Sequence, residues 1–537
     1  MKPTLLAAAA LLAATAALAP AASAADAPPS LNWSACRLPG LAQAARCAVL
    51  RRPLDPARPQ GPQIDLHIAL LPAVARAKAA DPVVFLAGGP GQSAIDLAAT
   101  LVARHGRLQQ RRDLVLVDQR GTGRSAPLLC PDDRPRAALM PLAEAMAIDE
   151  DQRRQRLAAC RSALQAQPHG DLRFYTTLLA TVDLEAVRLA LGAEQLNLIG
   201  ASYGTRAGLD YLRQHPQRVR RAVLDGLAPP DMRLHDTAAR DNQAALDAVL
   251  AACAADSQVV AGLPGCAQRH PDLARRLQAL RQRLPIATQL PHPISGRPER
   301  VMLQADQLSA WLRAPLYAPA LAAGLPAAID AAAQPPGRED FAPLLALASS
   351  LMGPGSPPLA TGMHLSVLCA EDLGPNAPPA DAADRGAQAD AANAFGGSFS
   401  RLYQQACADW PRGTVPADFY RLPAATAPVW LLSGSDDPVT PPRHGERVAQ
   451  ALGSRSRHLV VQGAGHGLLA LGCVRDAAQR FITAADDTAA LAATEAQGLN
   501  SCVARHQRAT AYRPIGTAPP AAAAASTASN ASAESRR

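Results

Sequence analysis

Leu198-Ile199-Gly200-Ala201-Ser202-Tyr203-Gly204 is the stretch of this 537-residue chain that most constrains its fold. It continues an apolar run typical of a buried strand and precedes a helical pattern over 205–214. Glycines on both sides of Ser202 let a strand turn sharply into a helix where other side chains would collide. This turn would hold the serine hydroxyl clear at the helix N-terminus. The alternative interpretation is a tight turn whose serine only caps the helix.

Short apolar runs recur on both sides of this stretch and alternate with helical segments such as 177–192 and 443–452. The alternation predicts an α/β fold, in which helices cover both faces of a mostly parallel sheet. Functional groups in such sheets gather at the carboxyl ends of the strands. The apolar runs are 66–71, 83–86, 114–117, 196–199, 223–224, 429–432 and 459–461.

The strand pattern is interrupted between residues 231 and 420, where Ala, Leu and Arg form helical patterns broken by Pro and Gly. We therefore expect two parts of one α/β core, 25–230 and 421–516, separated by a helical cap insertion. A second, unrelated domain is the alternative for 231–420. The Ala-rich tail, 517–537, is predicted to be disordered.

Residues 1–24 have the three parts of a secretory signal peptide: Lys2 near the start, an apolar run, and Ala22-Ser23-Ala24 at the end. An uncleaved membrane anchor is the alternative. No later stretch is apolar over the length of a membrane span, so we expect no membrane association after cleavage. An exported protein, either periplasmic or extracellular, is predicted.

The ten cysteines fit this compartment, because export makes disulfides the default interpretation. Nearest neighbours along the chain give one hypothesis for the connectivity, although sequence alone does not determine it. No pair has the Cys-x-x-Cys spacing of a zinc site or a redox dithiol. The hypothetical pairs are Cys36 with Cys47, Cys130 with Cys160, Cys253 with Cys266, Cys369 with Cys407, and Cys473 with Cys502.

The charge distribution argues against nucleic acid as a partner. The formal net charge is +8, but the 53 basic residues are scattered among 45 acidic ones, and aromatic residues make up only 3%. No basic stripe is interleaved with aromatics, as nucleic-acid binding would require. The sequence does not indicate an oligomeric state.

A serine hydroxyl becomes a nucleophile when a histidine removes its proton and a carboxylate orients that histidine. Asp437 and His466 follow the last two predicted strands, in the chain order Ser, Asp, His. Glycines flank His466, which suits an imidazole at an exposed loop tip. His444 is the reserve, for which a solvated helix position is the alternative.

Two other acids compete with Asp437 for the role of orienting carboxylate. Asp436 is its immediate neighbour, and Asp225 ends an earlier predicted strand. We prefer Asp437 over Asp436, and we expect Asp225 to be a structural hydrogen-bonding residue.

Acyl transfer also needs N–H donors for the developing oxyanion. One donor is predicted to be the amide of Tyr203, the residue after the nucleophile. The other is predicted to come from Gly88 and Gly89, in a glycine-rich loop that follows a strand. A phosphate-binding loop is the rival interpretation, but no Gly-Lys-Ser/Thr follows and no dinucleotide fingerprint is present.

Taken together, these motifs resemble the proline iminopeptidase and tripeptidyl aminopeptidase family of α/β-hydrolases. The exported, cysteine-rich form is most similar to the secreted tripeptidyl aminopeptidase branch. One departure is Ala87, where single-domain proline iminopeptidases usually have His, and it weakens an expectation of proline specificity. The matching segments are Gly88-Gly89-Pro90-Gly91, Asp118-Gln119-Arg120-Gly121-Thr122-Gly123-Arg124-Ser125, Gly200-Ala201-Ser202-Tyr203-Gly204, Asp437-Pro438-Val439-Thr440-Pro441 and Gly465-His466-Gly467.

The resemblance implies an eight-stranded α/β-hydrolase core, a helical cap, and cleavage near the free N-terminus of a peptide. It also implies that an acidic cap residue holds the α-ammonium group of the substrate, a role that falls on Glu371. A surface acidic pair beside a disulfide is the alternative for Glu371 and its neighbour Asp372.

The resulting hypothesis is an exported serine aminopeptidase that acts on peptides through Ser202, Asp437 and His466. It requires no metal or cofactor, because the sequence offers neither ligand-spaced His and Glu residues nor a nucleotide loop. A carboxylester hydrolase with the same triad is the first rival, since the triad does not distinguish amides from esters. A binding protein that keeps the fold without catalysis is the second.

Overall fold

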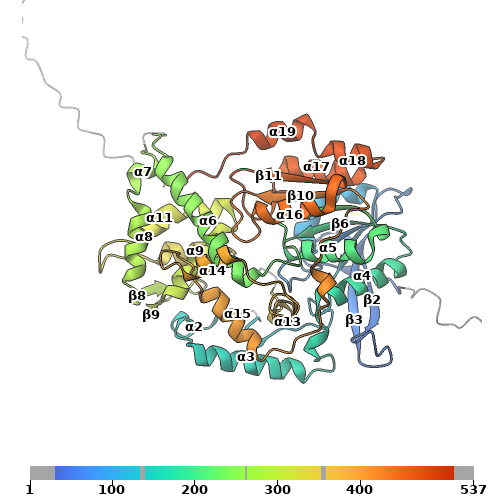
Figure 1. Cartoon of the computed structure of the whole chain (residues 1–537), viewed down its shortest axis with the longest axis horizontal. Coiled ribbons are helices and arrows are strands. Elements are labelled where there is room, and N and C mark those ends of the chain that lie inside the picture. Colours follow the sequence, from blue (N-terminus) through green and yellow to red (C-terminus); the bar gives the residue numbers. More distant parts are fainter. Residues whose placement is uncertain (1–30, 134–138, 261–262, 352–357, 513–537) are drawn as a thin grey trace, which may run out of the picture.

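The computed structural model describes residues 31–133, 139–260, 263–351 and 358–512. The predicted signal peptide, 1–24, and the predicted disordered tail, 517–537, lie outside the described residues. In Figure 1 a sheet-containing core occupies the right side and a mainly helical body occupies the left.

A nine-stranded sheet forms the centre of the core, in the order β1-β2-β3-β5-β4-β6-β7-β10-β11. The strands from β5 to β11 in this order pair in parallel, whereas β1, β2 and β3 add antiparallel strands at one edge. The predicted mostly parallel α/β sheet is confirmed. The strands are β1 Ser34–Arg37, β2 Ala44–Pro53, β3 Gln63–Leu71, β4 Val83–Leu86, β5 Leu114–Val117, β6 Leu196–Ala201, β7 Val219–Asp225, β10 Val429–Gly434 and β11 Ser456–Val461.

The described sheet has nine strands, one more than the eight that the resemblance implies. Two of the nine, β1 and β2, come from the chain before residue 54 and lack a continuous apolar run. In β2, Ala45, Ala48 and Leu50 are buried, while Arg46 and Val49 are exposed. A strand buried on one face only gives this weak alternating pattern. The edge strand β1 is mostly exposed and is joined to β2 by the disulfide Cys36–Cys47.

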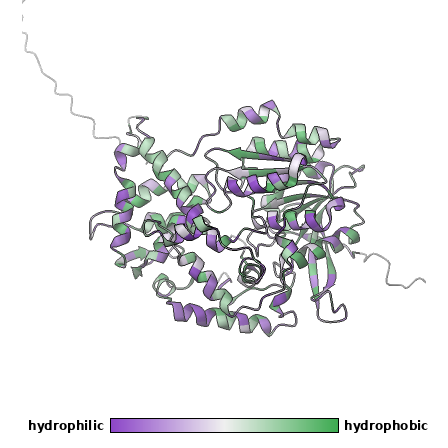
Figure 2. Cartoon of the chain, in the orientation of Figure 1, coloured by the Kyte–Doolittle hydropathy of each residue, from purple (hydrophilic) through white to green (hydrophobic). Residues whose placement is uncertain are grey.

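Successive residues of the central strands enter opposite apolar layers, as strand geometry requires. In β4, Val84 packs with helices on one face, and Val83 and Phe85 pack with helices on the other. Figure 2 shows the strands of the large sheet mostly in green, the colour of hydrophobic residues. The first face carries α4 Thr177–Ala190, α5 Tyr203–Gln214 and α16 Pro442–Leu452; the second carries α1 Ala98–His105, α17 Gly472–Thr483, α18 Asp487–Ala493 and α19 Gln497–Ala504.

Between β7 and β10 the chain forms the helical body. One of its helices, α13, packs into the cluster on the first face of the sheet, whereas most of the others share an apolar cluster of their own. Met146 of the earlier helix α2 belongs to the same cluster, so the body includes more than the insertion. Its helices are α6 Leu234–Ala255, α7 Cys266–Arg269, α8 Leu273–Gln282, α9 Ala305–Leu316, α10 Pro319–Ala322, α11 Leu325–Ala332, α12 Ala342–Leu351, α13 Thr361–Glu371, α14 Ala382–Ala389 and α15 Ser398–Ala408, with α2 Leu142–Met146 and α3 Glu150–Gln165 beside them.

The helical body also contains an antiparallel hairpin that the sequence analysis does not predict. Strands β8 Ile286–Pro291 and β9 Pro298–Leu303 form a separate two-stranded sheet. Among the apolar residues of the hairpin only Leu290, Val301 and Leu303 are buried, so its apolar signal is short and is flanked by Pro and charged residues.

All ten cysteines lie in the described residues and form the five disulfides that the nearest-neighbour hypothesis predicts. Two of them lie within the helical body, where Cys253–Cys266 joins α6 to α7 and Cys369–Cys407 joins α13 to α15. The others, Cys36–Cys47, Cys130–Cys160 and Cys473–Cys502, lie in the earlier and later parts of the chain.

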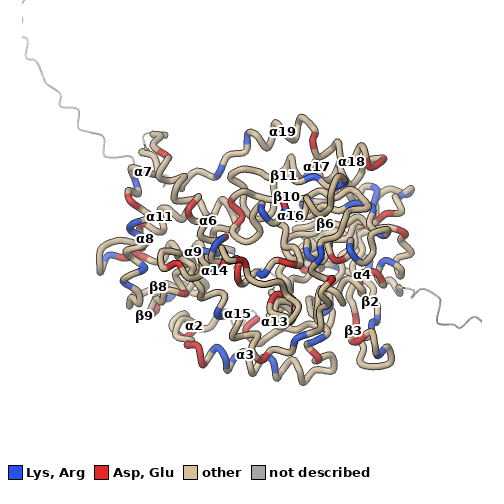
Figure 3. Tube along the Cα trace, viewed as in Figure 1, with Lys and Arg blue, Asp and Glu red and all other residues tan. Residues whose placement is uncertain are grey.

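Acidic and basic residues are interspersed along the whole described trace (Figure 3). Among the described helices, none combines the length and the apolar character that crossing a bilayer demands.

Candidate active site

Ser202 lies at the sharp turn between β6 and α5, as the glycine pattern predicts. Its φ of 54° and ψ of −123° are in a region that non-glycine residues rarely adopt, and such strain is characteristic of functional sites. A side chain at Gly204 would collide with the carbonyl oxygen of Leu86 in the neighbouring strand β4. Ser202 itself is half-buried, so the turn presents its hydroxyl to the surface.

His466 lies on the loop after β11 and makes a 2.8 Å hydrogen bond from its Nδ1 to Oδ2 of Asp437. Its side chain is 18% exposed, and Gly467 follows with a φ of 96°. When Nδ1 donates to the carboxylate, Nε2 is left free to accept a proton. The geometry therefore suits a histidine that acts as a general base.

Asp225 connects the serine turn to the histidine loop. Its backbone oxygen accepts a hydrogen bond from the amide of Ser202 at 2.9 Å, and its carboxylate accepts from Leu468 and Leu469, both at 2.8 Å. Burial raises the pKa of this carboxyl to about 6. The structure thus places Asp225 in the bracing role expected of it, next to the site but not bonded to His466.

The described residues contain no hydrogen bond between Ser202 and His466. Nucleophile and base are often apart in structures without substrate and approach when one binds.

Asp436 and Asp437 are adjacent in sequence but have different partners. Asp437 is buried, and its Oδ1 accepts the amides of Val439 and Thr440, both at 2.9 Å. Oδ2 accepts the hydroxyl of Thr440 at 2.7 Å, beside the bond to His466. Asp436 instead pairs with Arg508 at 2.8 Å. The structure therefore brings Asp437, and not Asp436, to the histidine.

The charges of Asp437 and His466 stabilise each other. Burial acts to lower the pKa of His466, but the carboxylate of Asp437 acts to raise it. The second effect prevails, so the pKa of His466 lies above the usual value of 6.5. Burial likewise acts to raise the pKa of Asp437, but His466 and the hydrogen bonds from Thr440 bring it below 3.8. Asp437 is therefore ionised at neutral pH and can stabilise an imidazolium.

The glycine-rich loop after β4 lies against the nucleophile. A Cβ on Gly88 would be 3.2 Å from the Cβ of Ser202, and Gly89 has a φ of 108°. Tyr203 begins α5, and the first amides of a helix have no acceptor within the helix. These positions suit the predicted oxyanion donors, Gly88, Gly89 and Tyr203.

The segment 118–125 braces this loop. Oδ1 of Asp118 accepts the hydroxyl of Ser93 at 2.6 Å and the amide of Ile95 at 3.1 Å. Oδ2 accepts the amide of Arg124 at 3.1 Å. The buried Asp118 thus fixes the chain just after the glycine-rich loop, which gives the 118–125 motif a structural role.

The structure does not place Glu371 where a substrate ammonium group could reach it. Its side chain is 0% exposed and contacts Arg206 at 3.1 Å, while Thr177 donates its amide at 2.7 Å and its hydroxyl at 3.0 Å. Burial raises the pKa of Glu371 to about 7, against the opposing charge of Arg206. The role carried over from the resemblance is therefore wrong for this conformation, and so is the surface alternative, because Asp372 is buried as well.

Glu371→Gln is expected to destabilise the fold. Arg206 keeps Asp372 as an ionic partner, but Gln has one acceptor oxygen where Glu has two. One of the two buried donors of Thr177 therefore loses its acceptor, which costs about 2 kcal/mol. Denaturant unfolding followed by tryptophan fluorescence measures this loss. Glu446→Gln, at an exposed position of α16, is the matched control and should change stability by less than about 0.5 kcal/mol. An unchanged stability for Glu371→Gln would contradict the structural role.

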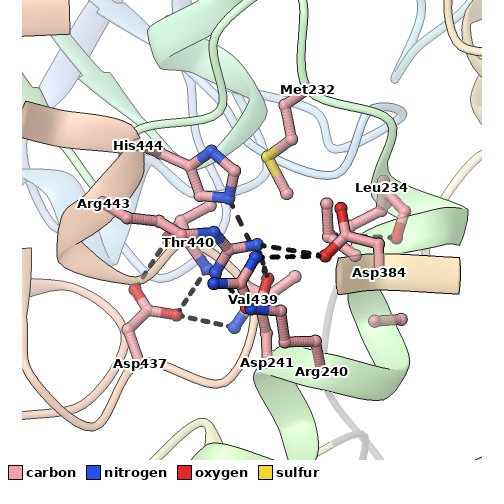
Figure 4. A network of polar contacts seen from close by, with 12 residues as sticks. Met232, Leu234, Arg240, Asp241, Asp384, Asp437, Val439, Thr440, Arg443 and His444 are labelled. Carbon is pink, nitrogen blue, oxygen red and sulfur yellow. Dashed lines mark hydrogen bonds and ion pairs between the residues drawn. The ribbon is translucent and has the colours of Figure 1, made fainter. Parts of the chain in front are cut away.

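A buried polar network joins the helical body to the core next to Asp437 (Figure 4). Arg443, near the start of α16, binds both carboxylate oxygens of Asp241 on α6. Asp384 of α14 lies 3.6 Å from Arg240 and 3.9 Å from Arg443. Since α16 begins directly after the loop of Asp437, the network ties that loop to the helical body.

His444 belongs to this network and is not the solvated residue expected of a surface helix. It is 3% exposed, and its Nε2 lies 3.9 Å from Oδ2 of Asp241. Burial lowers its pKa below 6.5. The hydrogen bond to Asp437 belongs to His466, so His444 has no role as the reserve base.

Two residues at the site are missed by the sequence analysis. The Oγ1 of Thr440 lies 3.1 Å from Nδ1 of His466, and the same hydroxyl donates a hydrogen bond to Asp437. Tyr317, just after α9, accepts the amide of His466 on its carbonyl oxygen at 3.2 Å and packs edge-on against the imidazole at 5.5 Å. The motif 437–441 contains Thr440, but no sequence signal marks Tyr317.

In the described parts of the chain, no three His, Cys, Asp or Glu residues gather in an arrangement able to hold a metal ion.

Comparison with known families matches two parts of the chain. Residues 81–311 match the family model of the alpha/beta hydrolase fold, and residues 392–490 match that of TAP-like proteins. Ser202 lies in the first match, and Asp437 and His466 lie in the second.

Two curated relatives match over part of their length. The serine protease Hip1 of Mycobacterium tuberculosis is 32% identical over 42% of this chain and 46% of its own. The tripeptidyl aminopeptidase of Streptomyces coelicolor is 31% identical over 37% of this chain and 38% of its own. The chain therefore spans less than half the length of the curated relatives it matches.

Among solved structures, the proline iminopeptidase of Mycobacterium smegmatis is 16% identical, with a TM-score of 0.33 over 85% of this chain and 99% of that one.

Proposed function

We propose, from the premise that this chain is an α/β-hydrolase related in sequence to tripeptidyl aminopeptidases, that it is a serine aminopeptidase. It would release residues or short peptides from the free N-terminus of a peptide through an acyl-enzyme intermediate. The observation that carries this proposal is the hydrogen bond of 2.8 Å between His466 and Asp437, at the same sheet edge as the strained Ser202.

In the first half of the proposed mechanism, Oγ of Ser202 attacks the carbonyl carbon of the scissile bond and its proton passes to Nε2 of His466. Asp437 holds the imidazole through Nδ1 and stabilises the positive charge that forms. The amides of Tyr203 and of the Gly88–Gly89 loop donate to the oxyanion. His466 then protonates the leaving amine, which departs.

In the second half, a water molecule gives its proton to His466 and attacks the acyl carbon. Collapse of the tetrahedral intermediate breaks the bond to Oγ, and the proton returns from His466 to Ser202. Apart from the substrate and this water molecule, both halves use only side chains and amides of this chain.

Export is the second part of the proposal. Five disulfides form in the structure, and such bonds persist in oxidising compartments outside the cytosol. The sequence of residues 1–24 supplies the corresponding signal. Fractionation of cells that express the full chain would test this, and recovery only from the cytosol would contradict it.

Initial rates on matched substrates test the aminopeptidase proposal. We expect free-amine mono-, di- or tripeptide amides to be cleaved and their N-acetylated counterparts to be cleaved at least tenfold more slowly, because a free ammonium group loses its interactions on acetylation. The longest fragment released shows whether the enzyme removes one, two or three residues per cut. Cleavage of short acyl esters alone would retain the hydrolase chemistry and reject the aminopeptidase assignment.

A further inference from the structure

Arg313 is a half-buried cation of α9 that has no acidic partner in the described residues. Its guanidinium stacks over the ring of Phe399, 4.4 Å from the centroid. No described carboxylate lies within ion-pair distance, and no hydrogen bond engages its N–H groups. Two other arginines of the helical body, Arg276 and Arg283, are by contrast paired with Asp330 and Glu339.

The neighbours of Arg313 place it between the two halves of the candidate active site. Tyr317, one helical turn further on, contacts His466 as described above. On the other side, the ring of Tyr403 packs on Phe399 at 4.9 Å. The charge of Arg313 acts on both phenols, where it opposes the rise in pKa that burial causes.

Tyr403 in turn connects to the glycine-rich loop. Its hydroxyl is 2.7 Å from Nε2 of His364, and Nδ1 of His364 is 3.1 Å from the carbonyl oxygen of Pro90. Arg313 therefore lies beside two contact chains, one ending at the catalytic histidine and the other at the proposed oxyanion loop.

The acids whose charges act on the same two phenols are already engaged. Asp437 binds His466 and Thr440, and Asp372 binds Arg206 and the amide of Leu234. The guanidinium nitrogens of Arg313 are not among the buried, unpartnered polar atoms of the described residues, so they are open to an anion supplied from outside the chain. A guanidinium stacked on an aromatic ring keeps its N–H donors pointing outward in its own plane, where they match a carboxylate in bidentate geometry.

We propose that Arg313 binds a carboxylate of the peptide substrate next to the catalytic groups, an inference that rests on the proposed function. The carboxylate belongs either to the C-terminus of a short peptide or to an Asp or Glu side chain, since both present the same group to the guanidinium. Arg313 is then a specificity-determining residue of the helical body.

Paired substrates test this inference. One arm compares short peptides with a free C-terminus and with a C-terminal amide, and the other compares Asp with Asn and Glu with Gln inside otherwise identical peptides. In at least one arm we expect the wild-type protein to favour the carboxylate by about 10- to 100-fold in kcat/KM, the range of a charge-assisted hydrogen bond. Arg313→Gln should reduce this ratio to about 1, and Arg313→Lys should restore part of it.

Arg300→Gln is the matched control, because Arg300 is an exposed arginine on β9 of the same helical body. It should keep the wild-type ratio. A wild-type protein that shows no preference in either arm overturns the inference even if Arg313→Gln does not fold. A preference that survives Arg313→Gln overturns it as well.

Failure of the proposed function gives a different result, namely no cleavage of any peptide. The preference for a carboxylate is then measured with two esters, p-nitrophenyl hemisuccinate and its methyl ester. A preference for the hemisuccinate that is lost in Arg313→Gln retains the carboxylate site on an esterase, and equal rates reject it.

Discussion

Ser202→Ala is expected to lower kcat by about a million-fold, the effect of removing the nucleophile from a serine hydrolase of this kind. The strained turn has no other hydroxyl that could replace it, because Ala201 and Tyr203 flank the position and the side chain of Tyr203 is buried away from it, bonded to Thr177 and Gln119. Initial rates on the best substrate of the peptide panel measure the loss.

The same variant should fold normally. The Oγ of Ser202 makes no hydrogen bond in the described structure, so alanine removes no contact, and stability should change by less than about 1 kcal/mol. Ser295→Ala, in the exposed turn of the β8–β9 hairpin, controls for a serine substitution without consequence. A fluorophosphonate should label the wild type and Ser295→Ala but not Ser202→Ala. A folded Ser202→Ala variant that retains more than a small percentage of activity would reject Ser202 as the nucleophile.

The parts of the site that sequence could predict are those fixed by local sterics. The turn at Ser202 needs glycine at 200 and 204 because β4 and the first turn of α5 leave no space for a Cβ. The central strands were predictable for a related reason, since burial on both faces requires nearly continuous apolar runs. Both constraints act within a few residues and are therefore visible in the sequence.

Contacts supplied by the helical body could not be predicted in this way. Tyr317 reaches His466 from a loop far along the chain, and Glu371 meets Arg206 inside the fold, where an acidic pair in the sequence gave no sign of burial. Arg313 is one of many arginines, and only its packing on Phe399 one helical turn before Tyr317 distinguishes it. Such roles depend on tertiary packing that no local pattern encodes.

The helical body is part of the site and not only a cover for it. It supplies Tyr317 to the histidine and Asp241 to Arg443, next to the loop of Asp437. The helical body therefore contacts His466 directly and contacts the helix that follows the loop of Asp437. The positions of His466 and of the loop of Asp437 therefore depend on residues of the helical body. A substitution of Asp437 tests the contact between that loop and His466.

Asp437→Asn is expected to reduce kcat by about ten thousand-fold while leaving the fold in place. The amide can still accept the hydrogen bonds of Val439 and Thr440, but it no longer fixes the imidazole tautomer or stabilises the imidazolium. Asp436→Asn is the matched control from the adjacent position. Asp436 pairs with Arg508 and not with His466, so kcat should fall by a few-fold at most. Equal losses in the two variants would contradict the assignment of the acid.

The pH dependence gives an independent measure of the same interaction. Because Asp437 raises the pKa of His466, the acid limb of the wild-type kcat/KM profile should lie above the usual histidine value of about 6.5. Loss of the carboxylate lowers that pKa, so the residual activity of Asp437→Asn should persist to lower pH than that of the wild type. For stability, the raised pKa of His466 contributes below about pH 6.5 and the lowered pKa of Asp437 contributes above about pH 4. The stability difference between wild type and Asp437→Asn should therefore be largest between these two values and decline on either side. If the acid limb lies at the same pH in the wild type and in Asp437→Asn, the pKa of His466 does not depend on Asp437.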